Sequence, residues 1–285
     1  MPQNNTPMLV LIHGLLSTPQ EFALLRNPLN TKEISHLALN IPGFTEQPHH
    51  QANTWRDWVD AAAEAIERDV PANRQIILAG LCTGGILAAA LALRYPRRFN
   101  RIALLSPAVA YDGWGLSRWR QWRHLGYVLG LSRFIHIAER EPYGIKNPKI
   151  RKWIATQMRE SAQSAAGPSR LPLWAIREGE RMMAHVHAHL DDLNLPTLIM
   201  HAREDEICSI ASVQSLFKQM PATDKRLVIL EDSYHMITID NDRHCVADEL
   251  AGFVTKPSPD VFNAKLHAAV APRPVFDNPT FQGSY

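Results

Sequence analysis

This sequence of 285 residues has few cysteines, a small net charge and few uninterrupted apolar runs. Three cysteines, Cys82, Cys208 and Cys245, lie far apart and are odd in number, so we expect neither a disulfide framework nor a CxxC metal site. The 30 basic and 28 acidic residues leave a formal net charge of +2, which gives no reason to expect nucleic acid as the main partner. Few cysteines and no sign of pairing indicate a reducing compartment, and we predict a cytoplasmic location.

No segment has the pattern of a signal peptide or of an unbroken membrane span. The first residues carry no positive charge before the short apolar run 8–12, which ends at His13. The uncharged and mostly apolar stretch of residues 76–93 comes close to the length of a transmembrane helix, but Gly80, Gly84 and Gly85 interrupt it. A buried strand, a tight turn and a buried helix explain this stretch better, so we expect no transmembrane segment.

Apolar runs of strand length alternate with helical patterns along most of the chain. Strands are expected at residues 8–12, 34–41, 75–79, 101–105, 197–200 and 226–230, and helices at about 54–68, 85–94, 210–219 and 240–253. Several of the strand runs are apolar throughout, which is typical of a parallel sheet covered on both faces. The expected fold class is therefore α/β, with a mostly parallel sheet and helices on both faces.

The alternation stops after the fourth expected strand. Residues 110–194 contain five of the seven tryptophans and two helix-like stretches, but no convincing strand. We predict that this segment is a helical cap, inserted between two parts of a core domain at residues 1–109 and 195–255. Residues 256–285 are rich in proline, and we predict an extended C-terminal arm there.

A glycine-flanked cysteine follows the third expected strand. The segment GLCTG, residues 80–84, joins the run QIILA to the run ILAAALAL. Strand, sharp turn and helix in this order are the setting of the G-x-S-x-G nucleophile elbow, which exposes the nucleophile above the sheet. Cys82 stands where serine is usual, and a helix N-terminus favours its thiolate form. The alternative is a small buried apolar cysteine, the usual state of a free cysteine.

An acid and a histidine follow two later strands. Asp205 comes after the run TLIM, and His235 comes after the run RLVIL. Active sites of open α/β sheets lie beyond the carboxyl ends of the strands, and the chain order nucleophile, acid, histidine is that of a catalytic triad. Taken singly, such an aspartate is more often solvated and such a histidine is more often structural. Glu204 and Glu206 flank Asp205, so the identity of the acid needs a test.

A His-Gly pair follows the first expected strand. Such a turn commonly supplies one backbone N–H to an oxyanion hole, and the second donor is the N–H of the residue after the nucleophile, Thr83. His13 could be mistaken for a catalytic base. We interpret it as a structural residue that fixes the turn, because His235 already fits the base.

In these segments the chain resembles the α/β-hydrolase superfamily, and within it the carboxylesterase and monoacylglycerol-lipase branch. The similarity lies within residues 9–240, in the segments LIHGLLSTPQEF, GLCTGG, LNLPTLIMHAREDEI and SYHMITID. The resemblance implies that Cys82 is the nucleophile, Asp205 the orienting acid and His235 the base. It also implies that the N–H groups of Leu15 and Thr83 form the oxyanion hole. In its cysteine the elbow is similar to dienelactone hydrolases and polyhydroxyalkanoate synthases, and families with this change include acyl-transferring members.

The predicted cap gives the only indication of a substrate. Residues 113–138 contain no acid, while arginines and tryptophans alternate at Trp114, Arg118, Trp119, Arg120, Trp122, Arg123 and Arg133. Trp114, Arg118, Trp119 and Arg123 are candidate binding residues for an anionic group such as a phosphopantetheine, or for a lipid surface. We favour the alternative, in which the tryptophans pack on the sheet and the arginines are solvated.

A second cluster, of histidines at 185, 187 and 189, suggests a metal site at first sight. Alternate positions of a helix do not share a face, so we predict no metal site there.

These features predict a cysteine-nucleophile acyl hydrolase, an esterase or thioesterase that acts through a covalent S-acyl enzyme. Its substrate would be a small-molecule ester or thioester with an apolar acyl group, with an acyl carrier as one candidate partner and no metal or organic cofactor. The alternative enzyme is an acyltransferase that uses an alcohol, amine or thiol as acceptor. A non-catalytic hydrolase-fold binding protein is the alternative of another class, although such a protein need not keep nucleophile, acid and base. The sequence does not indicate an oligomeric state.

Overall fold

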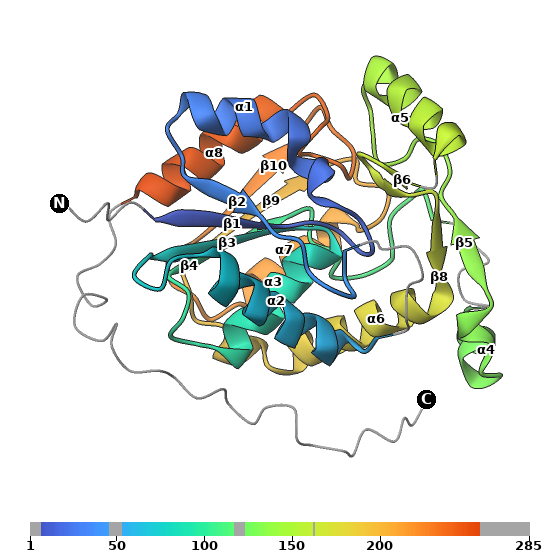
Figure 1. Ribbon diagram of the computed structural model, residues 1–285, viewed down its shortest axis with the longest axis horizontal. Helices are drawn as coiled ribbons and strands as arrows, with labels where there is room; N and C mark the ends of the chain where they lie inside the picture. Colours follow the sequence, from blue (N-terminus) through green and yellow to red (C-terminus); the bar gives the residue numbers. More distant parts are fainter. Residues whose placement is uncertain (1–6, 46–52, 117–122, 162, 257–285) are drawn as a thin grey trace.

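A six-stranded parallel sheet forms the centre of the computed structural model, which describes residues 7–45, 53–116, 123–161 and 163–256 (Figure 1). Every pair of neighbouring strands in this sheet is parallel, so the expected fold class is confirmed. The strand order is β10-β9-β4-β3-β1-β2. The bounds are β1 Met8–Ile12, β2 His36–Ala38, β3 Ile76–Leu81, β4 Arg101–Leu105, β9 Thr197–Ala202 and β10 Lys225–Leu230.

Helices cover both faces of the sheet, which explains why its central strands are buried at every position and mostly apolar. All residues of β3, β4 and β9 are buried. The apolar core on one face draws on α2, α3, α6 and α7, and the core on the other face draws on α1, α5 and α8. These helices run α1 Ala23–Thr31, α2 Trp55–Asp69, α3 Thr83–Arg94, α5 Pro148–Glu160, α6 Leu173–Ala188, α7 Ile210–Gln219 and α8 Arg243–Thr255.

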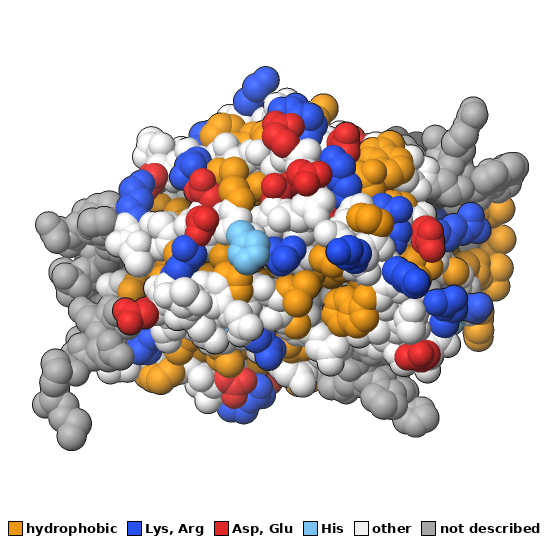
Figure 2. Space-filling view, turned by 90° about the horizontal axis from the view of Figure 1, so that it is seen from above, with side chains coloured by type: hydrophobic (Ala, Val, Ile, Leu, Met, Phe, Trp, Pro, Cys, Tyr) orange, Lys and Arg blue, Asp and Glu red, His pale blue; other side chains and the backbone are white. Residues whose placement is uncertain are grey.

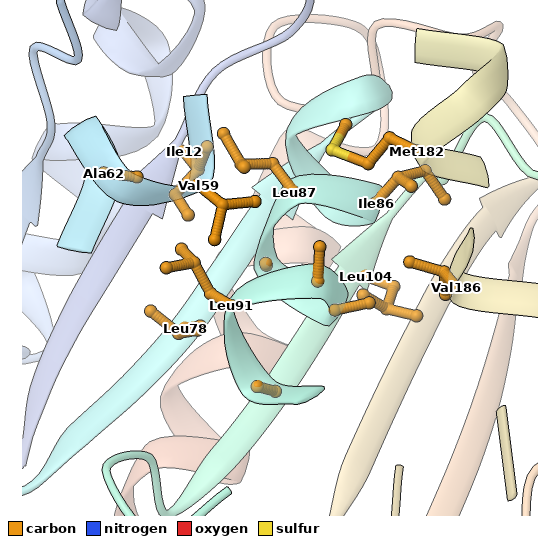
Figure 3. Close-up of a cluster of buried hydrophobic side chains, with 14 of the residues drawn as sticks. Ile12, Val59, Ala62, Leu78, Ile86, Leu87, Leu91, Leu104, Met182 and Val186 are labelled. Atoms are coloured by element: carbon orange, nitrogen blue, oxygen red, sulfur yellow. The ribbon is translucent and has the colours of Figure 1, made fainter. Parts of the chain in front are cut away.

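Helix α3 is the most deeply buried helix, and it carries the N-terminus on which the site depends. Its residues from Thr83 to Leu93 are all buried, and its only charge is at Arg94. Figure 3 shows its apolar side chains between those of α2, α6 and the strands, among them Ile12, Val59, Ala62, Leu78, Ile86, Leu87, Leu91, Leu104, Met182 and Val186. The uncharged stretch 76–93 is therefore a strand, a turn and a buried helix, as the sequence predicts. Within the described residues, no helix is long and apolar enough to cross a membrane.

The segment between β4 and β9, which we call the inserted segment, differs from the expectation in having strands. Four strands of two or three residues form two small antiparallel pairs, β5 with β8 and β6 with β7. Strands this short leave no alternation in the sequence, which is why they were not expected. The elements are α4 Arg123–Val128, β5 His136–Ala138, β6 Gln163–Ser164, β7 Gly167–Pro168 and β8 Arg170–Pro172, together with α5, α6 and the short 3-10 helices Leu131–Arg133 and Leu190–Asp192.

Two further differences from the expected elements lie in the N-terminal part of the chain. The strand expected at 34–41 is limited to His36–Ala38, and α1 was not expected because Pro28 lies inside it. A 3-10 helix, Pro19–Phe22, precedes α1 and is capped by the Thr18 side chain. The predicted C-terminal arm lies outside the described residues except for Lys256.

The inserted segment also exposes a group of large apolar side chains. Figure 2 shows hydrophobic side chains gathered at the end of the molecule where α4 and β5 lie in Figure 1. The exposed residues in this part of the chain are Leu125, Val128, Leu129, Leu131, Phe134, Ile135 and Ile137.

Candidate active site

Cys82 occupies a sharp turn between β3 and α3. Its φ is 56°, in the left-handed region that a cysteine rarely adopts, so the turn is a strained one. Backbone hydrogen bonds hold it there, because Cys82 N–H donates to Leu105 O at 2.9 Å and Gly85 N–H donates to Cys82 O at 3.0 Å. The turn fits only with glycine at position 84, since a Cβ there would lie 2.2 Å from the backbone oxygen of His13. The structure thus has the geometry of a nucleophile elbow.

The side chains of Asp205 and His235 meet beyond the carboxyl ends of β9 and β10. His235 Nδ1–H donates to Asp205 Oδ2 at 2.8 Å, and both residues are buried. The other carboxylate oxygen, Oδ1, accepts the backbone N–H groups of Ile207 at 2.8 Å and Cys208 at 3.0 Å. These three bonds fix the orientation of the carboxylate and place the proton of the imidazole on Nδ1. Nε2 of His235 is left as the nitrogen that can accept a proton.

Electrostatics favour a basic imidazole at position 235. Burial lowers the pKa of His235, but the charges of Asp205 and Cys82 raise it, and the net result lies well above the usual value. Burial raises the pKa of Asp205, but His235 and the backbone donors outweigh this and hold it below its usual range. Nε2 of His235 is buried and accepts no hydrogen bond from a described protein group. The Cys82 side chain interacts with the same ring and raises its pKa, so this buried nitrogen is suited to exchange a proton with the thiol.

The two glutamates beside Asp205 point elsewhere. Glu204 is exposed and pairs with Lys146 Nζ at 2.8 Å. Glu206 is buried, and its Oε2 accepts the backbone N–H of His235 at 3.2 Å, while burial raises its pKa. Of the three neighbouring carboxylates, Asp205 alone is hydrogen-bonded to the His235 ring.

A directed chain of hydrogen bonds fixes the turn after β1. Ile41 N–H donates to the Thr45 hydroxyl at 2.7 Å, the hydroxyl lies 2.7 Å from His13 Nε2, and His13 Nδ1 lies 2.8 Å from Gly14 O. Because a carbonyl only accepts, Nδ1 of His13 carries the proton and Nε2 accepts from Thr45. Burial lowers the pKa of His13 to about 4, so the ring is neutral. His13 therefore has the structural role expected from the sequence.

The expected oxyanion donors are Thr83, which follows Cys82 in the chain, and Leu15, in the turn after β1. The backbone N–H groups of Leu15 and Thr83 make no hydrogen bond to another protein group within the described residues. Both residues are buried, and a Cβ atom added to Gly14 would lie 3.6 Å from Cys82 Cβ. The turn that carries Leu15 is thus in contact with the candidate nucleophile.

The inserted segment contacts the site, but its candidate binding residue Arg123 is paired with an acid of the same segment. Tyr111 interacts with the Thr83 side chain, and burial raises the pKa of its hydroxyl. Arg123 pairs with Glu180 at 2.6 Å, and Glu180 also accepts the Tyr127 hydroxyl at 2.9 Å. An arginine neutralised in this way is a weak candidate for clamping an anionic group.

Of the other candidate binding residues in the inserted segment, the structure describes Trp114. Trp114 is 59% exposed and donates from Nε1 to Glu204 O at 3.0 Å, so the expectation that it packs on the sheet is wrong. Arg118, Trp119, Arg120 and Trp122 lie outside the described residues. Backbone hydrogen bonds join the segment to the loop of the candidate acid, from Gly113 N–H to Ile207 O at 2.9 Å and from Gly115 N–H to Glu206 O at 3.0 Å.

The histidine cluster on α6 forms contacts of another kind. The rings of His185 and His189 lie 4.3 Å apart, and His185 also packs on Trp55. His187 Nε2 lies 3.2 Å from Val109 O. In the part of the chain that the structure describes, no three His, Cys, Asp or Glu side chains are grouped as metal ligands.

Three residues close to the site were missed by sequence reasoning. Glu21 accepts the Gly14 N–H, Glu206 accepts the His235 N–H, and Tyr111 reaches Thr83. Glu21 is the only acid in the segment LIHGLLSTPQEF, which is a weak signal that could have marked it. The other two depend on contacts between segments far apart in the chain.

Comparisons with known proteins place the chain in a family. Residues 3–242 match the Hydrolase_4 family, described as serine aminopeptidase, S33. A thermostable monoacylglycerol lipase of Bacillus sp. (strain H-257) is 22% identical over 89% of this chain and 92% of its own length. A pimeloyl-[acyl-carrier protein] methyl ester esterase of Aromatoleum aromaticum is 23% identical over 85% of this chain and 96% of its own.

A solved structure supports the fold. The soluble variant of monoglyceride lipase from Saccharomyces cerevisiae superimposes with a TM-score of 0.72 at 14% identity, over 90% of this chain and 89% of its own. The chain therefore belongs to the Hydrolase_4 family of α/β-hydrolases, in the monoacylglycerol-lipase and esterase-like branch.

Proposed function

We propose that this chain hydrolyses carboxylic esters through a covalent S-acyl enzyme on Cys82. The observation that carries the proposal is the 2.8 Å bond from His235 Nδ1 to Asp205, which leaves Nε2 available to Cys82, whose side chain interacts with the His235 ring from a strained elbow. Relatives named monoacylglycerol lipase and carboxylesterase support the ester as the bond that is broken. The matched family is described as serine aminopeptidase, so the comparison does not support a cysteine nucleophile, and this role has to be tested on this chain directly.

The first half of the reaction acylates the enzyme. Nε2 of His235 takes the thiol proton, and the sulfur of Cys82 bonds to the ester carbonyl carbon. The carbonyl oxygen becomes negatively charged, and the N–H groups of Leu15 and Thr83 donate to it. When the C–O bond to the alcohol breaks, the proton on Nε2 passes to the departing oxygen. The proton on Nδ1 of His235 stays there throughout and donates to Asp205, whose carboxylate stabilises the imidazolium.

The second half returns the enzyme to its starting state. Nε2 of His235 takes a proton from water, and the hydroxide oxygen bonds to the acyl carbon. The C–S bond then breaks, the acid is released, and Cys82 regains its proton from Nε2. An alcohol, amine or thiol in place of water would give acyl transfer, which the cysteine favours because thioesters react readily with such acceptors. Product analysis separates the two outcomes.

Two features of the inserted segment bear on the substrate. Arg123 is paired with Glu180, which argues against a phosphorylated carrier held by this arginine. The exposed apolar side chains of α4 and β5 form an apolar surface on the same segment, which favours an ester with an apolar acyl chain. The relative named for a carrier-linked methyl ester keeps such a substrate in the test.

Intact mass spectrometry during turnover tests the proposal. We expect p-nitrophenyl esters and acyl thioesters of increasing chain length to give an acyl adduct on the wild-type protein and none on Cys82→Ala. The matched control is Cys245→Ala, which removes an exposed cysteine and should leave turnover unchanged. Equal turnover by Cys82→Ala and wild type would overturn the cysteine mechanism. Binding of esters with no turnover in the whole panel would favour a non-catalytic binding protein.

A further inference from the structure

A buried carboxylate holds the peptide that precedes one of the expected oxyanion donors. Glu21 lies in the 3-10 helix Pro19–Phe22 and is only 3% exposed. Its Oε2 accepts the backbone N–H of Gly14 at 2.6 Å, a short bond of the kind that a charged acceptor makes. The Gly14 N–H belongs to the His13–Gly14 peptide, which directly precedes the peptide that carries the Leu15 N–H, so this bond fixes the start of the turn from which the Leu15 N–H is directed.

The backbone of Glu21 is tied to the other side of the site. The Thr238 hydroxyl donates to Glu21 O at 2.7 Å, and Thr238 lies three residues after His235 in the chain. Thr238 is fully buried, so this contact is shielded from water. Glu21 thus connects the turn with the expected oxyanion donor to the loop with the expected base.

We propose that Glu21 is a positioning residue, whose side chain holds the His13–Gly14 peptide so that the Leu15 N–H, in the next peptide, can reach the oxyanion. The proposal rests on the proposed function, because it assigns Leu15 to ester hydrolysis at Cys82. Oxyanion donors act only when they are fixed about 3 Å from the position that the developing charge will occupy. A Gly14 Cβ position 3.6 Å from Cys82 Cβ shows that this peptide is close enough to the nucleophile for its orientation to matter.

The role requires an acceptor atom and not a negative charge. Burial raises the pKa of Glu21 to about 7, against the opposing effects of the Gly14 N–H and of His235, so the carboxyl gains a proton near neutral pH. A protonated carboxyl still has a carbonyl oxygen that can accept the Gly14 N–H. Glutamine presents an equivalent oxygen in a side chain of the same size. Alanine presents none and leaves a buried N–H without a partner.

Three variants separate positioning from general stabilisation. We expect Glu21→Ala to lower kcat by about 10- to 100-fold with little change in KM, because the donor acts on the transition state. Glu21→Gln should recover most of this loss. The control is Glu178→Ala, because Glu178 is also a buried glutamate that accepts a backbone N–H, from Trp55 at 3.2 Å, but on α6 away from Gly14. It should lower the melting temperature and leave kcat unchanged.

A spectroscopic measurement tests the same bond without catalysis. His13–Gly14 is the only His-Gly pair in the sequence, so labelling histidine carbonyl carbons and glycine nitrogens selects the Gly14 amide alone. We expect its proton resonance far downfield in the wild type, retained in Glu21→Gln and shifted upfield in Glu21→Ala.

The outcomes are distinct for the two proposals. An unchanged Gly14 resonance in Glu21→Ala, or kcat losses that follow the melting temperature equally in Glu21→Ala and Glu178→Ala, would overturn the positioning role. If the Gly14 resonance differs among the three proteins as expected but the wild type hydrolyses no ester, the hydrogen bond is supported and ester hydrolysis is rejected.

Discussion

Replacing Asp205 with asparagine should disable the His235 base while leaving the fold intact. The structure dictates how the new amide sits, because Oδ1 of Asp205 accepts two backbone N–H groups, from Ile207 and Cys208. The oxygen of the asparagine amide must take that position, which turns the NH₂ group towards His235. Nδ1 of His235 must then accept instead of donate, so its proton moves to Nε2 and the ring can no longer take the thiol proton.

The expected cost in kcat is about 10⁴-fold, the size of effect seen when an imidazole is held in the wrong tautomer. Rates rise with pH as the imidazole loses its proton, and Asp205 raises the pKa of His235, so the acid limb of residual kcat/KM should move to lower pH. Glu204→Gln and Glu206→Gln are the matched controls, because neither side chain is hydrogen-bonded to the ring. Steady-state rates between pH 5 and 9 with a p-nitrophenyl ester would measure all three variants. A loss below about tenfold in Asp205→Asn, or a larger loss in either control, would refute the assignment of the acid.

Three further predictions concern single residues. A thiol alkylator should label Cys82 before the buried Cys208 or the exposed Cys245 and abolish turnover, as peptide mapping can show; full activity after complete labelling of Cys82 would contradict this. Gly84→Ala should lower the free energy of unfolding by at least about 3 kcal/mol in urea titrations, because its Cβ would lie 2.2 Å from the His13 backbone oxygen. Burial lowers the pKa of His13 to about 4, so the contribution of its neutral ring to the free energy of unfolding is complete above pH 6.5. About 3 kcal/mol of the free energy of unfolding is lost as the pH falls towards 4. His13→Gln should therefore flatten the pH dependence of unfolding in that range, and an unchanged slope would count against the buried neutral ring.

The sequence predicted those parts of the site that local patterns specify. The elbow at Cys82 was recognisable because a strand, a glycine-flanked turn and a helix are consecutive, and Asp205 and His235 each follow a strand directly. The role of Glu21 was only weakly marked and that of Tyr111 was not recognisable, because both depend on contacts between segments that meet only after folding. The pairs β5–β8 and β6–β7 were missed for a related reason, since strands of two or three residues have no period to detect.

The division of labour between the core and the inserted segment has a consequence for engineering. Cys82, Asp205, His235 and both expected N–H donors belong to the core, while one stretch of the inserted segment, from Gly113 to Gly144, is joined to their loops by backbone bonds at both of its ends. At the first end these bonds involve Gly113 and Gly115, and at the second the Met236 N–H donates to Gly144 O at 2.8 Å. The 28 residues between Gly115 and Gly144 could therefore be exchanged with those of a relative, as a cassette, without moving the reactive groups. Such chimaeras should change which esters are accepted, and those that keep Glu139, which interacts electrostatically with His235, should keep the pH profile of the reaction.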